Sequence, residues 1–245
     1  MLAFAFSAQL VLLFWLLHRE GFATRRMVGY VVLLSGFGFL GAKAASIVFH
    51  GGLRSAEIEL TGGLRYPGAL LGIIAGGYLL RRMLPAGLTF ARFADIWTPS
   101  FALACALGRL GCLAMGCCYG EIAHLPWSIR YPRGSTPWLE HYKAGAVASD
   151  APLSLPVHPF PLYLFSMELG LLVLTLWLQK RKTYDGQVIL VFLALHGVLK
   201  FAIEFTRHPY SWMHQAVLPI ALVAIAILVL RARQERQLIQ SSVPA

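Results

Sequence analysis

The chain has 245 residues, of which 58% are hydrophobic, 12% aromatic and only 13% charged, and its mean hydropathy is +0.65. Soluble domains carry about 25% charged residues, so this composition excludes an ordinary soluble domain and indicates a polytopic membrane protein. The net charge of +10 lies in short basic clusters at the ends of apolar segments. With no long basic face or tail, the charge indicates membrane topology and gives no sign of a nucleic-acid partner.

Apolar segments recur along the whole chain, and about 20 such residues suffice to cross a bilayer. They predict an all-α membrane protein with about seven spans, near 2–17, 28–49, 66–84, 97–117, 160–178, 187–206 and 213–230. The first segment lacks a preceding basic region and a small-residue cleavage site, so we expect a retained span and not a removed signal peptide. We expect residues 1–245 to form a single integral membrane domain.

Lys and Arg residues are distributed unequally between the two sides of these spans. Twelve of the 21 lie on the side of the C-terminus, six lie on the opposite side, and the remaining three fall within spans. The positive-inside rule then places the N-terminus outside and the C-terminus in the cytoplasm. The proline-rich stretch 120–158 is predicted to be a small irregular insertion on the outer face, together with the loop 50–65.

Residues 105–120 contain all four cysteines and a lone arginine, in the order C-A-L-G-R-L-G-C-L-A-M-G-C-C-Y-G. A charge at membrane depth is costly, so Arg109 indicates a functional interior and not a lipid-facing surface. Its planar guanidinium is suited to binding a phosphate. Gly116 and Gly120 are small enough for a partner helix or a lipid headgroup to approach the backbone closely.

The cysteines allow several interpretations: metal ligands, a redox pair, nucleophiles or small core residues. Adjacent Cys117 and Cys118 lack the C-x-x-C spacing of zinc ligands, and no second cluster completes a site, so we expect no bound metal. Cys105 is expected to be a small buried hydrophobic residue. A reactive thiol at Cys112, Cys117 or Cys118 stays open.

The sixth span carries a polar stripe of His196, Lys200, Glu204 and Arg207, at steps of four, four and three. These steps place the four residues on one face of a helix. Lys200 and Glu204 alone would neutralise each other as a structural ion pair. Because the stripe is longer than one pair requires, it predicts a lined interior, and Glu168 of the preceding span is a candidate to face it.

Residues 108–120 and 197–207 match, in register, the motifs G-R-x-G-N-F-x-N-G-E-x-x-G and G-x-x-R-F-x-x-E-F-x-R. These motifs belong to the prolipoprotein diacylglyceryl transferase family, which the chain resembles and whose members are bacterial inner-membrane enzymes with seven spans. Further similarity lies at Gly41-Ala42-Lys43, Gly62 to Leu70, Pro126-Trp127 and His158-Pro159 with Leu162-Tyr163.

The chain departs from the family pattern at several polar positions. Cys112 and Met115 stand where the family has asparagines, and Cys117 stands where it has a glutamate. Lys200 replaces an arginine, the His-Pro motif lacks its Gln and Glu, and Pro67 occupies the place of a histidine that often precedes G-G-L.

The resemblance implies transfer of a diacylglyceryl group from phosphatidylglycerol to the cysteine thiol of a prolipoprotein lipobox peptide at the outer leaflet. Arg109, Lys200 and Arg207 would hold the phosphate, and Glu204 would orient a cation. His196 is the candidate to replace the missing histidine base. The reaction forms a thioether, releases glycerol phosphate and needs no metal or organic cofactor.

Two other functions stay open because of the departures. One is a paralogue that transfers a lipid-derived group to a different acceptor, with the cysteines taking part. The other is a lipid-binding or transport protein without catalytic activity.

The implied substrate contacts also include Gly116 and Gly120, where the headgroup would approach the backbone.

Overall fold

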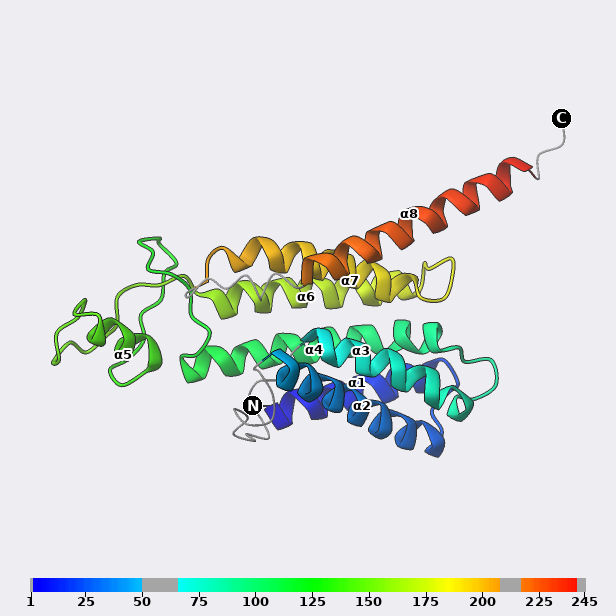
Figure 1. The fold of residues 1–245 in the computed structure, drawn as a ribbon, viewed down its shortest axis with the longest axis horizontal. Coiled ribbons are helices and arrows are strands. Elements are labelled where there is room, and N and C mark those ends of the chain that lie inside the picture. Colours follow the sequence, from blue (N-terminus) through cyan, green and yellow to red (C-terminus); the bar gives the residue numbers. More distant parts are fainter. Residues whose placement is uncertain (1, 50–65, 208–216, 242–245) are drawn as a thin grey trace. The chain divides into compact units, whose positions relative to one another are not determined.

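A computed structural model describes residues 2–49, 66–207 and 217–241, and these form helices joined by loops, of which the longest lie on either side of the short helix Thr136–Lys143 (Figure 1). The helices are α1 (Leu2–Arg19), α2 (Arg25–Phe49), α3 (Tyr66–Leu79), the 3-10 helix η1 (Leu80–Met83), α4 (Phe90–Met115), α5 (Thr136–Lys143), α6 (Phe160–Gln179), α7 (Gln187–Glu204) and α8 (Val217–Ser241). The described residues contain isolated β-bridges but no strand.

The all-α polytopic class is confirmed. Five helices are long and apolar enough to cross a membrane, namely α2, α4, α6, α7 and the first 18 residues of α8, and α1 is a shorter apolar helix. These helices, with α3, fall where the seven spans were expected. The predicted loop 50–65, residues 62–65 of the family resemblance and the predicted turn at 208–212 lie outside the described residues.

α4 begins seven residues before the expected span because Thr89 supplies a cap. The Thr89 hydroxyl accepts a hydrogen bond from the Arg92 backbone N–H at 3.0 Å, as an N-cap residue does. Pro99 lies inside α4 and has no N–H to donate to the Asp95 carbonyl. Gln179 Nε2 donates to that carbonyl instead, at 2.8 Å, so the helix continues through the proline.

The chain divides into two compact units, one formed by residues 14–94 and the other by residues up to 13 with 95–245. In the first unit, α2 and α3 pack with their backbones in close approach. A side-chain carbon added at Gly41 would lie only 2.9 Å from the Gly72 Cα atom. This small-residue contact is typical of helix pairs in membranes.

The second unit contains most of α4 together with α6, α7 and α8. Ala102 of α4, Leu171 of α6 and Phe192 of α7 form a buried cluster that joins three helices. α7 and α8 meet at a glycine, since a carbon added at Gly197 would lie 2.8 Å from the Val217 carbonyl oxygen. The insertion between α4 and α6, which holds α5, extends beyond the ends of those two helices (Figure 1).

Asp95 of α4 is fully buried. Its carboxylate hydrogen-bonds to the α6–α7 loop and to the first turn of α7. Its Oδ2 atom accepts from Lys182 Nζ and from the Gly186 backbone N–H, both at 2.9 Å, and its Oδ1 atom accepts from the Ile189 N–H at 3.1 Å. Gly186 is the N-cap of α7. The carboxylate therefore satisfies N–H groups that the first turn of a helix leaves unpaired, and it complements the helix dipole.

Asp95→Ala is expected to lower the free energy of unfolding by about 3 kcal/mol, because it leaves a part-buried lysine and helix N–H groups without their acceptor. Asp185→Ala is the matched control, since Asp185 contacts the same Lys182 at 3.3 Å from an exposed position, where an ion pair is worth less than about 1 kcal/mol. Thermal unfolding in detergent measures both. Equal losses in the two variants would contradict the capping role.

Candidate functional site

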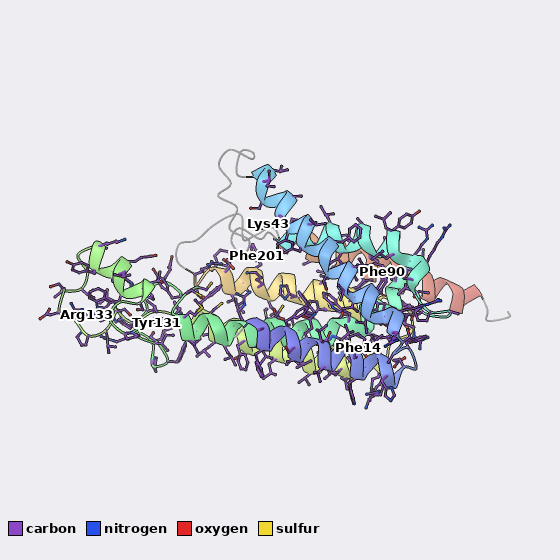
Figure 2. All side chains as sticks on the ribbon, turned by 90° about the horizontal axis from the view of Figure 1, so that it is seen from below. Phe14, Lys43, Phe90, Tyr131, Arg133 and Phe201 are labelled. Atoms are coloured by element: carbon purple, nitrogen blue, oxygen red, sulfur yellow. The ribbon has the colours of Figure 1, made fainter. Side chains whose placement is uncertain are left out.

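The insertion 116–159 is anchored to the C-terminal end of α7 by backbone hydrogen bonds. Glu121 N–H donates to the Thr206 carbonyl, just beyond α7, at 2.9 Å, and Gly120 forms a backbone bridge with Arg207. Within the insertion, Gly120 N–H donates to the His158 carbonyl at 3.1 Å. Tyr119, Tyr131 and Val157 form the small core of this insertion. Figure 2 shows Tyr131 and Arg133 among its side chains, beyond the end of α4. The ends of α4 and α7 and the start of α6 therefore meet at one place.

The polar stripe predicted on the sixth span is present at the end of α7, centred on a buried carboxylate. Glu204 has no exposed surface. Its Oε2 atom accepts from Lys200 Nζ at 2.9 Å, and its Oε1 atom accepts from Arg207 Nη1 at 3.1 Å. One carboxylate thus fixes two cations, and the Arg207 guanidinium also lies over the Phe160 ring at 5.4 Å.

Arg109 lies on α4 close to the same group of charges. It interacts electrostatically with Lys200 and, together with Arg207, with Cys118. Arg109 has no ion pair with any carboxylate in the described part of the chain, unlike Lys200 and Arg207. A partly buried guanidinium without a carboxylate partner is costly in a membrane helix, so this position favours another anion nearby, either the Cys118 thiolate or a bound ligand.

A second polar pair, of a histidine and a carboxylate, lies deeper along α7. His196 Nδ1 is 3.1 Å from Glu168 Oε1 of α6, and both side chains are buried. The prediction that Glu168 faces the interior is therefore supported by a direct contact. Cys105 of α4 interacts electrostatically with both Glu168 and Arg109, so these residues of α4, α6 and α7 line the same interior.

Gly116 ends α4 in a Schellman motif. Gly116 N–H donates to the Leu113 carbonyl at 3.2 Å, and Cys117 N–H donates to the Cys112 carbonyl at 3.1 Å. Gly116 has a φ of 66°, the left-handed conformation that this motif requires and that glycine adopts without strain. The helix-ending motif explains why a glycine stands at position 116. The predicted contact of Gly116 with substrate stays a prediction.

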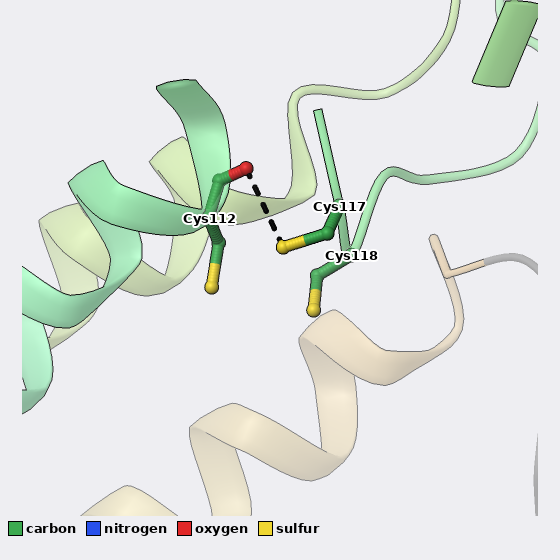
Figure 3. A group of neighbouring side chains, drawn as sticks. All are labelled: Cys112, Cys117 and Cys118. Carbon is green, nitrogen blue, oxygen red and sulfur yellow. Dashed lines mark hydrogen bonds between the residues drawn. The ribbon is translucent and has the colours of Figure 1, made fainter. Parts of the chain in front are cut away.

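The turn gathers three cysteines at the end of α4 (Figure 3). The Sγ atoms of Cys112, Cys117 and Cys118 all lie within 4.8 Å of one another, and all three thiols are free. Cys117 Sγ also contacts the Cys112 carbonyl oxygen at 3.7 Å. Cys118 has a φ of 57°, which is uncommon for a residue other than glycine. The spacing along the sequence gave no sign that Cys112 would join the adjacent pair.

The two thiols beyond α4 have different electrostatic environments. A hydrogen bond from the Cys112 thiol, together with the charges of Arg207 and Arg109 and a hydrogen bond from Cys117, lowers the pKa of Cys118 to about 5 against the opposing effect of burial. Burial raises the pKa of Cys117, and the neighbouring Cys118 adds to that effect. Cys118 is therefore the more acidic of the two.

The resemblance residues at 126–127 and 158–163 form a hydrogen-bonded group that the sequence did not predict. Trp127 Nε1 donates to the Tyr163 hydroxyl at 2.8 Å, and that hydroxyl lies 3.1 Å from His158 Nδ1. These contacts join the insertion to the first turn of α6.

Gly120→Ala is expected to destabilise the protein by about 1–3 kcal/mol, because the added carbon would lie 2.9 Å from the His158 carbonyl oxygen. Gly108→Ala is the control, since no atom lies within 4 Å of a carbon added there and alanine favours a helix over glycine by up to about 1 kcal/mol. Thermal unfolding and hydrogen exchange at residues 119–121 measure the effect. Unchanged exchange in Gly120→Ala would show that the anchor does not depend on this close approach.

Comparisons with known proteins agree on one family. The family model for prolipoprotein diacylglyceryl transferase matches residues 1–232. A phosphatidylglycerol–prolipoprotein diacylglyceryl transferase of Ralstonia pickettii is 32% identical over 190 residues, which cover 69% of this chain and 63% of that protein. The corresponding proteins of Bordetella avium and Geobacter sulfurreducens are 28% and 29% identical, covering 80% and 71% of this chain and 73% and 64% of theirs.

In the first and third of these relatives, the matched region spans less than two thirds of the relative's own length. The family match nevertheless covers nearly the whole of this chain, including both motifs that carry the charged residues of the site. The chain belongs to the prolipoprotein diacylglyceryl transferase family.

Proposed function

We propose that this chain transfers a diacylglyceryl group from phosphatidylglycerol to the cysteine thiol of a prolipoprotein. The names of its relatives support both substrates. The observation that carries the proposal is Arg109, a guanidinium on an apolar helix that has no carboxylate partner among the described residues and lies close to Lys200 and Arg207. A lipid phosphate supplies the missing anion.

The charges that line this interior support an anionic ligand. Three cations, Arg109, Lys200 and Arg207, stand against two carboxylates, Glu204 and Glu168. Glu204 pairs with Lys200 and Arg207, and Glu168 lies against His196, so Arg109 is the cation without a carboxylate partner among the described residues. The phosphodiester of phosphatidylglycerol carries one negative charge and would offset that cation in a medium where charge is costly.

The same cations stabilise the reaction as it proceeds. The acceptor thiolate attacks the glyceryl carbon next to the phosphate, a C–S bond forms, and the C–O bond breaks with its electrons leaving on the phosphate oxygen. Charge grows on the leaving phosphate, where Arg109 and Arg207 are aimed, and a low-dielectric site strengthens that interaction. Glu204 orients Lys200 and Arg207 so that they need not reorganise during the step.

We assign the base to His196 and the role of positioning it to Glu168. Glu168 Oε1 lies 3.1 Å from His196 Nδ1, and a carboxylate beside one imidazole nitrogen orients the ring and leaves the other nitrogen to accept a proton. His196 lies four residues before Lys200, one helical turn or about 6 Å deeper along the axis. The thiol proton would leave toward this side, while the phosphate leaves toward Arg207.

The distribution of basic residues supports an orientation with the N-terminus outside, the C-terminus in the cytoplasm and the site at the outer leaflet of the bacterial inner membrane. The insertion 116–159 would then cover the outer end of the site. Its anchoring at Gly120 and Glu121 keeps it at the end of α7, where an acceptor peptide would arrive.

Arg109→Ala is expected to lower kcat/KM for transfer by about 100- to 1,000-fold, because it removes a cation from the leaving phosphate. Arg109→Lys should recover part of the activity, since an ammonium keeps the charge but not the planar pair of donors. Arg181→Ala is the control at the opposite end of α6, where Arg181 lies over the Trp177 ring. Unchanged transfer in Arg109→Ala would remove this residue from the phosphate site.

Replacement of the family asparagine and glutamate by Cys112 and Cys117 favours, as a second candidate, a paralogue with a different acceptor. Expression in a strain depleted of its own transferase separates the two. The proposed function predicts restored growth and a diacylglyceryl thioether on lipoprotein cysteines, read by mass spectrometry. Phospholipid binding without thioether formation, in a chain that folds and inserts, would favour the second candidate.

A further inference from the structure

The three thiols at the end of α4 are not used by the proposed transfer reaction. We propose that Cys112, Cys117 and Cys118 form a binding site for one soft metal ion, with Cu(I) as the ion that fits best. This inference does not rest on the proposed function, because it concerns a ligand set that the reaction leaves untouched.

The distances between the sulfur atoms suit a metal better than a disulfide. Metal–sulfur bonds of about 2.3 Å place three sulfurs around one ion about 4.0 Å apart. All three Sγ atoms already lie within 4.8 Å of one another, so they need to approach by less than about 1 Å. A disulfide requires two sulfurs at about 2.05 Å, a much larger movement that would also leave the third thiol unused.

The chemistry of the ligands selects the ion. The group contains three cysteines and, among the residues that the structure describes, no His, Asp or Glu that joins them. Thiolates favour Cu(I) and zinc over hard cations, which prefer oxygen ligands. Zinc in structural sites takes four ligands, whereas Cu(I) is satisfied by three sulfurs. A three-thiolate group therefore favours Cu(I).

The charge around the site suits a metal–thiolate complex. Three thiolates with one Cu(I) carry a net charge of two negative, and Arg207 and Arg109 both act electrostatically on Cys118. Arg109 has no carboxylate partner among the described residues and offsets one of these charges, and Arg207, which already pairs with Glu204, offsets part of the other. The complex would therefore not be an uncompensated charge at the membrane boundary.

The backbone holds the ligands in place before any metal binds. The Schellman turn at Gly116 returns the chain toward Cys112, and the left-handed conformation of Cys118 is uncommon for a side chain of its kind. The Tyr131 hydroxyl is buried without a hydrogen-bond partner in the described structure, and it interacts electrostatically with all three cysteines. Such a hydroxyl is suited to donate to a metal-bound thiolate, as outer-shell groups do.

This proposal reverses the expectation that no metal is bound. That expectation was based on the spacing of the ligands along the sequence, where Cys112 and Cys117 are five residues apart and Cys117 and Cys118 are adjacent. The spacing rule assumes ligands presented by a loop or hairpin. Here a helix end and the turn after it present them, and a five-residue separation becomes a close contact.

The test loads the detergent-solubilised full chain with Cu(I) under anaerobic, reducing conditions. After competition with a Cu(I) chelator and desalting, retained copper is measured by inductively coupled plasma mass spectrometry, and thiolate-to-copper charge transfer is followed by ultraviolet absorption. We expect one Cu(I) per chain and protection of three thiols from iodoacetamide. Zn²⁺ alone is expected to be lost at a chelator strength that leaves Cu(I) bound.

Single variants then locate the ligands. Cys112→Ser, Cys117→Ser and Cys118→Ser should each lower Cu(I) affinity by about 100-fold or more, since loss of an outer-shell partner alone costs about 10- to 100-fold. Tyr131→Phe should lower it by about tenfold. Cys105→Ser is the matched control and should retain copper, because Cys105 lies outside the group.

Several results would overturn the site. These are copper retention below stoichiometry in a folded wild-type chain, equal retention in all four serine variants, or mild oxidation that converts two of the three thiols to a disulfide and leaves no copper bound. Monodisperse gel filtration and an unchanged thermal transition establish folding for each variant. Transfer activity is measured separately, so failure of copper binding and failure of the proposed function are distinguishable.

Discussion

The buried carboxylate of Glu204 is the contact on which the rest of the site depends. It binds Lys200 and Arg207 at once, and it lies where α7 ends and the insertion attaches. Without it, two cations in an apolar environment would repel each other and the end of the helix would lose its fixed geometry. Arg207 also forms a backbone bridge with Gly120, so it belongs to the anchor of the insertion as well. The residue whose charge Glu204 holds therefore also holds the insertion at the end of α7.

The helices were predictable because hydrophobic length dominates the folding of a membrane protein. The stripe from His196 to Arg207 was predictable for a similar reason, since helical periodicity alone places it on one face. Local chemistry decided the ends of the helices. Thr89 extends α4, and Gln179 replaces the hydrogen bond that Pro99 cannot make. The second effect depends on a contact between residues 84 positions apart, which no local pattern reveals.

The contacts of the site were less predictable than its residues. The sequence indicated Arg109, Lys200, Glu204 and Arg207, but periodicity on one helix does not show which cation shares the carboxylate and which is left without a partner. That distinction carries the proposed function. Asp95 was missed altogether, because an acidic residue near the start of an apolar helix gives no sign that it caps another helix. Cys112, Cys117 and Cys118 were named as candidates, but their convergence was not predicted, because the turn at Gly116 and not their spacing brings them together.

The departures from the family motif have a common electrostatic consequence. Where the family has a glutamate this chain has Cys117, and where it has an asparagine it has Cys112. One carboxylate and one amide are thus replaced by thiols, and Arg109 acts electrostatically on Cys112. Loss of a carboxylate makes the environment more positive, and a positive environment favours anions of any kind, thiolates as well as phosphate. Under the two proposals, the same two arginines would hold the lipid phosphate on one side and balance the thiolates on the other. The substitutions would then leave the phosphate-binding cations in place and add a set of soft ligands next to them.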